Sequence, residues 1–293
     1  MKNFSLVILL LFAVPFFGNA QETPKDSTEN SSAKIYVITT QNGGIFIGSI
    51  ISENSKEVLI KTKNLGEVSI PKYEIKERKE LKAGDLTASG ELKTTPIFAT
   101  RYFLTTNGIP LDKKDGYYQL NLFGPEFHYG VSDNFSVGAM TSWMGIPIIG
   151  NAKYSFKIQE NIHFGVGTLL GTGSWASPGF VMALPFGSLT IGNKRSNINF
   201  SGGYGTAGTA GYFSGTALIS VSGMKQLSNK ISFVFDSFIV PEVDYAGTIA
   251  LVVPGLRFHT GENKAFQFGL AGIVVDGEVA PLPIPMLTWF RKL

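Results

Sequence analysis

The sequence predicts an all-β chain, in which a small β-module precedes a transmembrane antiparallel up-and-down β-barrel of about twelve strands. In residues 96–293, apolar residues repeatedly alternate with small or polar ones, as in 135–143, where Phe135, Val137 and Ala139 share one face. Side chains of a strand point alternately to its two faces, so one face meets an apolar environment and the other a polar one. Such alternation over about 200 residues, after a secretion signal, is typical of a barrel with lipid outside and a polar lumen.

Residues 1–20 have the pattern of a signal peptide. Lys2 supplies a basic start, residues 6–17 are apolar, and small residues end the segment at Ala20. This pattern predicts cleavage before Gln21, and the apolar run is shorter than the ~20 residues of a membrane-spanning helix. A retained anchor is the alternative. The sequence contains no Cys, which excludes disulfides and a lipid-modified Cys.

Charge divides the rest of the chain into two parts. Residues 21–95 contain 11 basic and 11 acidic residues, whereas the much longer 96–293 contains 13 and 11. A lipid-facing wall tolerates few charges, which places the barrel at 96–293. We expect a disordered tether at 21–33, a β-module at 34–80 and a linker at 81–95. The net charge of +3 gives no reason to expect a nucleic-acid partner.

The module contains five short predicted strands, at 35–40, 44–52, 56–62, 67–70 and 73–77. Turn signals separate them, and Asn42-Gly43 is the strongest because both residues tolerate positive φ. Residues 35–78 resemble the Sm-like or SH3-like modules that precede some outer-membrane barrels, and the whole chain resembles uncharacterised Gram-negative outer-membrane β-barrel proteins. The resemblance implies a periplasmic docking or plug element, with a passive spacer as the alternative. The RNA binding of Sm proteins is not expected of a secreted chain.

Twelve candidate strands follow, and short connections alternate with longer ones, as expected for tight periplasmic turns and roomier outer loops. An even count with both ends in the periplasm suits a bacterial barrel, although ten or fourteen strands remain open. At 124–125 and at 254–255 the apolar residues switch from one set of alternate positions to the other, which predicts a β-bulge at each place. The predicted strands are 97–106, 116–131, 134–144, 146–157, 161–172, 179–192, 197–206, 211–227, 230–240, 247–260, 264–275 and 283–292.

Strand parity places a few polar side chains in the lumen. The candidate lumen-facing polar residues are Glu126, His128, His163, Asp236, Arg257 and His259. The three histidines raise the alternative of a metal site or a pH gate, but their strands lie far apart around the wall, whereas shared ligands need bonds of about 2 Å to one ion. We therefore expect no metal and no cofactor.

No catalytic constellation is evident, so we expect no enzyme activity. None of the three histidines has a Ser close by in its own strand, as a barrel lipase or deacylase would require. Asp112, Asp115, Asp244 and Asp276 have no His beside them, unlike the rim residues of an omptin-like protease.

These features lead to three functional hypotheses for an outer-membrane protein with residues 21–95 in the periplasm. The first is a pore or small-solute channel, the second a structural or docking protein whose barrel anchors the module, and the third a lipid-active enzyme. Expected partners are outer-membrane lipid and lipopolysaccharide, and a periplasmic protein for residues 34–80. The tail 286–293 resembles the C-terminal strand that barrel-assembly machinery reads, which implies that machinery as a further partner.

Overall fold

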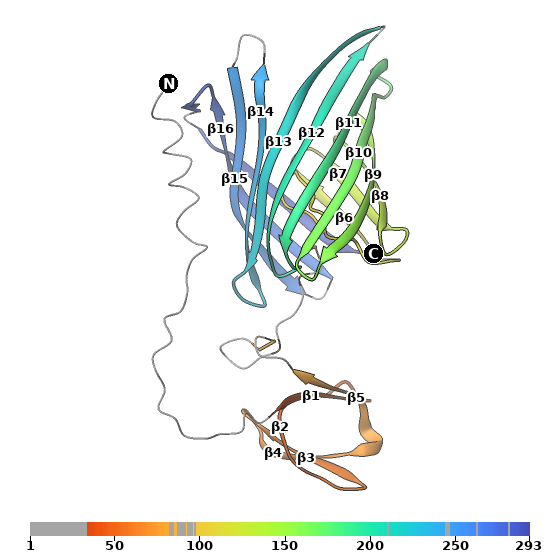
Figure 1. Cartoon of the computed structure of the whole chain (residues 1–293), viewed down its shortest axis with the longest axis vertical. Coiled ribbons are helices and arrows are strands. Elements are labelled where there is room, and N and C mark those ends of the chain that lie inside the picture. The colour runs from red at the N-terminus through yellow and green to blue at the C-terminus, as the bar shows by residue number, and fades with distance from the viewer. Residues whose placement is uncertain are drawn as a thin grey trace. The chain divides into compact units, whose positions relative to one another are not determined.

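The computed structural model describes residues 34–81, 85–86, 92, 96, 98–209, 211–243, 247–261, 263–280 and 282–293 (Figure 1). The chain divides into two compact units, Met1–Lys93 and Thr94–Leu293. The expected signal peptide (1–20), the tether (21–33) and most of the linker (81–95) lie outside the described residues.

The first unit contains a five-stranded antiparallel sheet with the order β4-β3-β2-β1-β5. Alternating residues such as Val58 and Ile60 point into its small core, together with Ile38 and Ile70. The five predicted strands are present, but the last begins later than expected because a short 3-10 helix takes up Lys72–Glu74. The strands are β1 (Ile35–Thr40), β2 (Ile45–Glu53), β3 (Glu57–Thr62), β4 (Gly66–Pro71) and β5 (Ile75–Leu81).

The second unit is a closed antiparallel barrel of twelve strands, which confirms the predicted fold class and strand count. Each strand pairs with its neighbours in sequence, β18 pairs with β6, and β15 pairs with β16 to complete the ring. The ring consists of β6 (Gly116–Asn121), β7 (Pro125–Gly130), β8 (Phe135–Thr141), β9 (Ile148–Gln159), β10 (Ile162–Gly173), β11 (Ser177–Gly192), β12 (Ser196–Thr209), β13 (Tyr212–Gln226), β14 (Ile231–Val243), β15 (Gly247–Gly261), β16 (Lys264–Val275) and β18 (Ile284–Lys292). The two-residue β17 (Glu278–Val279) pairs only with β16.

Although the count is right, its first two members are not those predicted. Residues 98–106 of the predicted strand 97–106 form no barrel strand, and the predicted long strand 116–131 is two strands, β6 and β7, joined by a reverse turn. The side chain of Asn121 accepts hydrogen bonds from the amides of Phe123 and Gly124, and Gly124 has a φ of 157°. The expected bulge at 124–125 is therefore a hairpin turn, built by an Asx motif and a glycine.

The second expected bulge, at 254–255, is also absent. Strands β14 and β15 pair in constant register through this region, from Asp236–Val253 to Phe233–Leu256. Val253 therefore faces inward, where it is fully buried, and Leu251 packs beside it. The prediction was wrong because it assumed a polar lumen, whereas this part of the lumen contains an apolar segment against which Val253 packs.

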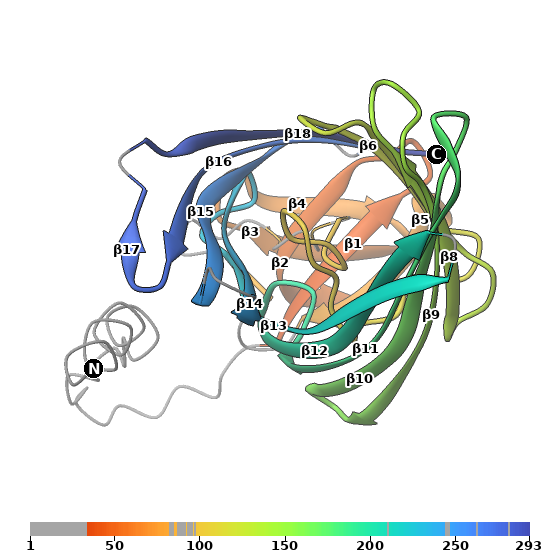
Figure 2. The same ribbon diagram turned by 90° about the horizontal axis from the view of Figure 1, so that it is seen from above.

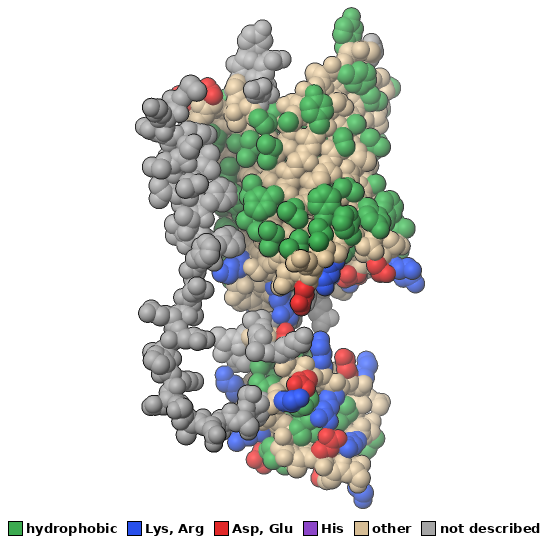
Figure 3. Space-filling view, in the orientation of Figure 1, with side chains coloured by type: hydrophobic (Ala, Val, Ile, Leu, Met, Phe, Trp, Pro, Cys, Tyr) green, Lys and Arg blue, Asp and Glu red, His purple; other side chains and the backbone are tan. Residues whose placement is uncertain are grey.

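We call the two ends of the barrel the turn end, which holds the tight connections 131–134, 160–161, 193–195 and 227–230, and the loop end opposite. Hydrophobic side chains cover the visible flank of the barrel, and charged side chains gather along the turn end (Figure 3). Several large aromatic residues are exposed on this outer surface, namely Tyr129, Trp143, Tyr154, Trp175 and Trp289. Tyr117 is instead buried inside the barrel. Among the described residues, no helix is long and apolar enough to cross a membrane.

Candidate functional site: a plugged barrel lumen

The segment that precedes β6 fills the turn end of the lumen. We call residues 98–111 the plug segment; Figure 2 shows it inside the ring of strands. It folds as a tight hairpin, in which Arg101 bridges to Thr106 and the amide of Tyr102 donates to the carbonyl of Thr105. Phe98, Tyr102 and Asn107 are fully buried. The predicted strand 97–106 is therefore wrong: its apolar residues meet the inner wall of the barrel instead of lipid.

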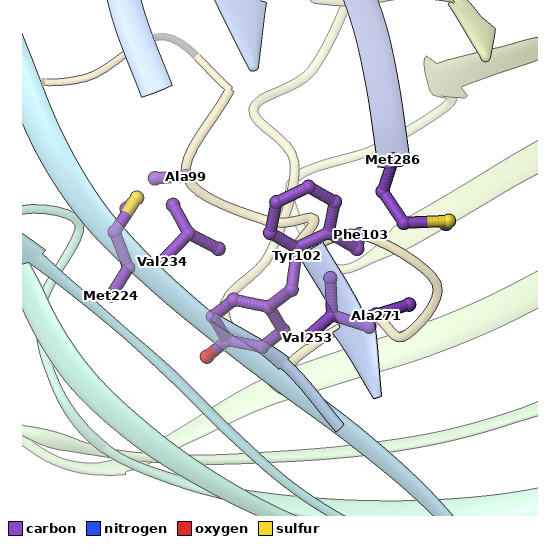
Figure 4. Packing of buried hydrophobic residues seen from close by; sticks show 8 residues of the cluster. All are labelled: Ala99, Tyr102, Phe103, Met224, Val234, Val253, Ala271 and Met286. Atoms are coloured by element: carbon purple, nitrogen blue, oxygen red, sulfur yellow. The ribbon is translucent and has the colours of Figure 1, made fainter. Parts of the chain in front are cut away.

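Apolar contacts seat the plug segment on one side of the lumen. Tyr102 and Phe103 pack against inward-facing residues of β13 to β16 and β18 (Figure 4). The wall residues of this cluster are Met224, Val234, Val253, Ala271 and Met286. At the base of the plug, Phe98 stacks on Phe290 with ring centroids 5.1 Å apart and meets the edge of Tyr117 at 5.6 Å. Phe290, which belongs to the tail with the expected assembly signal, thus faces the lumen.

Asp236, on β14, holds the tip of the plug segment. Its carboxylate accepts hydrogen bonds of 2.6–3.0 Å from the three successive amides of residues 103–105 and a 2.6 Å bond from the Thr105 hydroxyl. The carboxylate is completely enclosed, so these donors replace the water that an ionised group needs. A carboxylate that collects consecutive backbone amides fixes the path of the hairpin as well as its position.

Arg257, on β15, binds the other side of the hairpin. Its guanidinium is fully buried and donates to the carbonyls of Phe98 and Arg101, the latter at 2.6 Å. Its Nε donates to Gln267 at 2.6 Å, and Gln267 in turn donates to the carbonyl of Tyr102. The planar guanidinium also lies 4.6 Å from the ring centre of Phe290. One arginine therefore ties the plug backbone to two strands and to the aromatic base.

A third group of buried charges lies across the lumen, on β7 and β9. Arg101 of the plug segment forms an ion pair with Glu126 at 2.6 Å, and Glu126 also contacts His128 at 2.9 Å. Lys153 donates to the carbonyls of Asn107 and Ile109 at 2.7 and 3.3 Å. Carbonyl oxygens thus take the role that a carboxylate usually has beside a buried lysine.

Smaller polar contacts complete the seat on β11 and β12. Tyr102 donates to Asn197 at 2.5 Å, and the amide of Gly108 donates to Thr190 at 2.7 Å. A Cβ atom at Gly108 would lie 2.9 Å from the carbonyl oxygen of His163, so only glycine allows this approach of plug and wall.

The structure separates the six candidate residues into two groups. Asp236, Arg257 and Glu126 bind the plug segment directly, and His128 contacts Glu126 and stacks on Tyr117. His163 and His259 lie elsewhere in the wall and are not brought together with His128. Within the described ranges, no three His, Cys, Asp or Glu residues are close enough to share a metal ion.

His259 has a neighbour that spacing along the strand did not reveal. Its Nε2 lies 3.0 Å from the hydroxyl of Ser232 on the adjacent strand. Ser232 is fully buried, and the described residues place no carboxylate in an ion pair with His259. The pair therefore lacks the access and the orienting acid that a nucleophilic serine requires.

Comparisons with known proteins add little to this geometry. No family model matches the chain, and no curated protein matches it. The chain is similar to the NanC porin, with 11% identity and a TM-score of 0.44 over 61% of this chain and 99% of that one. It is also similar to OmpT of Vibrio cholerae, which is expressed in the outer membrane, with 11% identity and a TM-score of 0.36 over 89% and 95% of the two chains. Values this low identify no family.

Proposed function

We propose that this chain is an outer-membrane protein whose barrel is a gated pathway for a small solute, closed by the plug segment. The closed ring and the apolar outer surface support the membrane location, because hydrocarbon tolerates strands only where the backbone pairs internally. The position of the plug segment in the lumen supports the proposal that the pathway is gated. A steadily open pore, the simplest form of the sequence-based hypothesis, does not agree with a lumen filled at one end.

The observation that carries the proposal is the number of strands that bind one short segment. Side chains of β7, β9, β11, β12, β14, β15 and β16 all bond to the plug segment or its side chains. All seven are hydrogen bonds or ion pairs, and several involve a charged group. When the plug segment moves, water can replace its polar partners. A polar binding site is therefore easier for the segment to leave than an apolar one of equal size.

The path of the chain also permits withdrawal. The base of the plug packs on Tyr117 and Phe290, near the ends of β6 and β18 that lie at the turn end. Beyond the plug, Asp112 forms an ion pair with Lys194 of the tight turn 193–195. Both ends of the segment thus leave through the turn end, and the hairpin can slide out without threading.

Ion flux through the full-length protein in planar bilayers tests the gate. We expect wild type to stay closed and Asp236→Ala to open, since three plug amides lose their acceptor. Replacement of residues 102–107 by Gly and Ser should open it further, and Asp133→Ala, in the turn 131–134, should stay closed. Slower gel migration after heating reports that each barrel is folded. Steady currents in wild type, or no currents in either plug variant with a folded barrel, would overturn the proposal.

A docking role for the first unit is a second candidate, favoured by its surface. Large apolar side chains are exposed there at Ile45, Leu65 and Tyr73, the last at 75%. Exposed apolar side chains of this size are typical of protein contacts when they lie together. Deleting residues 21–90 should then abolish capture of a periplasmic partner and leave the closed barrel unchanged; unchanged capture would exclude this role.

A further inference from the structure

The lumen contains a cavity that runs beside the plug segment and extends beyond it to the middle of the wall strands. About 850 Å³ of space between atoms lies within its lining, and this figure includes open solvent. Its walls are mainly apolar, with Leu169, Leu184, Phe186, Leu218 and Phe238 among the lining residues. A water-filled passage for a polar solute would not need such a lining.

The backbone ladder of the wall beside this cavity is incomplete at one seam. Strands β12 and β13 pair without interruption from Ser196–Lys225 to Thr209–Tyr212. Strands β13 and β14 pair from Gln226–Ser232 to Gly223–Phe235, then once more at Ile219–Ile239, and nowhere else among the described residues. Figure 1 shows these two strands diverging towards the loop end.

Two residues of β14 explain why its backbone pairing with β13 is incomplete. The hydroxyl of Ser237 inserts between the strands, where it accepts from the amide of Val221 at 3.0 Å and donates to its carbonyl at 2.6 Å. It thereby replaces the backbone partners of Val221. Pro241, further along β14, has no N–H to donate. The ladder therefore ends near the middle of β13.

The cavity borders this seam. Leu218, Ile219 and Ser220 of β13 all line it, and Ile219 is 46% exposed on the outer surface. Phe238, on the other side of the seam, lines it too. Fewer backbone bonds join β13 to β14 than join β13 to β12, so this seam is the part of the wall that separates at the smallest cost in hydrogen bonds.

The floor of the cavity is rich in hydrogen-bond donors. Arg101 and Lys153 line it, and none of the described lining residues is Asp or Glu. Lys153 is 6% exposed and has no carboxylate within 4.0 Å among the residues described. Three buried atoms of lining residues lack a partner within the described chain, namely Arg101 Nε, Asn151 Nδ2 and Ser220 Oγ. These groups suit an anionic oxygen acceptor.

We propose that the cavity binds a long-chain carboxylic acid that enters from the membrane between β13 and β14. The apolar walls take the hydrocarbon chain, and the carboxylate meets the donors around Lys153. Lys153 Nζ donates to Thr106 Oγ1 at 3.3 Å as well as to two plug carbonyls, so the carboxylate takes the place of the Thr106 hydroxyl while the carbonyl bonds keep the plug segment in the lumen. The inference therefore stands apart from the gate.

Photolabelling of the full-length protein in phospholipid vesicles tests this site. The probe is palmitate with a diazirine on its chain, and peptide mapping locates the adducts. We expect labels on residues such as Leu184, Leu218 and Phe238, displaced by palmitate but at least tenfold less by hexadecanol, which lacks the charge. Lys153→Met should reduce labelling at least tenfold, whereas Lys157→Met, exposed on the same strand, should not.

A second variant separates ligand binding from plug movement, since Lys153 also bonds to the plug segment. Leu184→Trp fills the cavity without touching a plug bond and should lower labelling at least tenfold while the barrel stays closed to ions. Labelling that persists in Leu184→Trp, or that is confined to outward residues such as Phe200, overturns the site. Equal competition by hexadecanol overturns its acid specificity. A wild-type barrel that conducts ions steadily would contradict the gate alone.

Discussion

The two halves of the barrel interior are built by opposite means. At the turn end, inward-facing charges such as Asp236, Arg257 and Glu126 are fully enclosed, and each binds the plug segment. At the loop end, inward-facing residues such as Leu184 and Leu218 are apolar and border open space. The enclosed charges thus lie where protein fills the lumen, beside apolar wall residues such as Val253, whereas the wall beyond the plug segment presents apolar side chains to open space.

This difference shows that charged wall residues lie where the plug segment supplies partners for them. Buried charges are tolerated at the turn end because plug backbone groups form hydrogen bonds with them. Removing one of these charged side chains would leave its plug backbone groups without partners. Apolar residues at the loop end are stable only beside another apolar surface, which agrees with a hydrocarbon ligand arriving through the β13–β14 seam.

The largest effect on the turn-end half is expected from Arg257→Met. The substitution keeps the bulk but leaves the carbonyls of Phe98 and Arg101 and the side chain of Gln267 without a donor. We expect a loss of about 4 kcal/mol in the free energy of unfolding. Urea unfolding in lipid vesicles measures it. Arg291→Met, an exposed arginine on β18, is the matched control and should cost less than about 0.5 kcal/mol.

Glu126→Gln should have a somewhat smaller effect. Arg101 would remain buried with its charge uncompensated, since Glu126 is its carboxylate partner at 2.6 Å. Loss of one member of a buried pair costs about 3 kcal/mol. The same unfolding assay checks this, with Glu160→Gln at an exposed turn as control. Equal stability of both variants would show that the plug is not seated on this pair.

Ser237→Ala tests the role of the Ser237 hydroxyl at the seam between β13 and β14. Val221 would lose both partners of its amide and carbonyl, which should cost about 1–2 kcal/mol. Ser220→Ala, on the neighbouring strand, removes a buried hydroxyl that has no partner in the described chain and should cost nothing in ligand-free protein. If both changes have the same effect, the Ser237 hydroxyl is not what replaces the ladder.

The smallest effect concerns the first unit, where charges remain exposed. Hydrogen bonds from Lys72 and Arg78 hold the pKa of Glu53 below its usual value. A lowered pKa means that these pairs stabilise the folded module above the unfolded pKa and lose this contribution as pH falls through the folded one. NMR titration should place the Glu53 midpoint below 4.5 and move it upward in Arg78→Met. An unmoved midpoint would contradict this assignment.

The alternation of apolar and polar residues predicted those barrel strands whose outer face meets lipid and whose inner face is polar. The alternation in 135–143 and in most later strands correctly identified barrel wall, because both faces of those strands meet a uniform environment. It failed at 97–106 and at Val253, where apolar residues pack inside the barrel. Alternation reports that two faces differ, but it does not say which one meets lipid once the lumen contains protein.

For the same reason, the sequence predicted only part of the candidate site. The alternation along the strands correctly placed Asp236, Arg257 and Glu126 in the lumen. The plug backbone groups that bind Asp236 and Arg257 are about 130 to 160 residues away in sequence, and no local pattern encodes such pairings. Lys153 and the plug segment were missed. The one available signal was Arg101, a charge in an apolar stretch that alternates poorly, which is incompatible with a lipid-facing strand.

Amide hydrogen exchange in the plug segment measures whether this segment occupies the lumen. Residues 103–105 donate their amides to Asp236 inside the barrel, so these amides should exchange as slowly as those of the paired wall strands in the membrane-embedded protein. Exchange at the rate of an exposed loop, in wild type with a folded barrel, would show that the segment does not occupy the lumen and that the barrel is not closed by it.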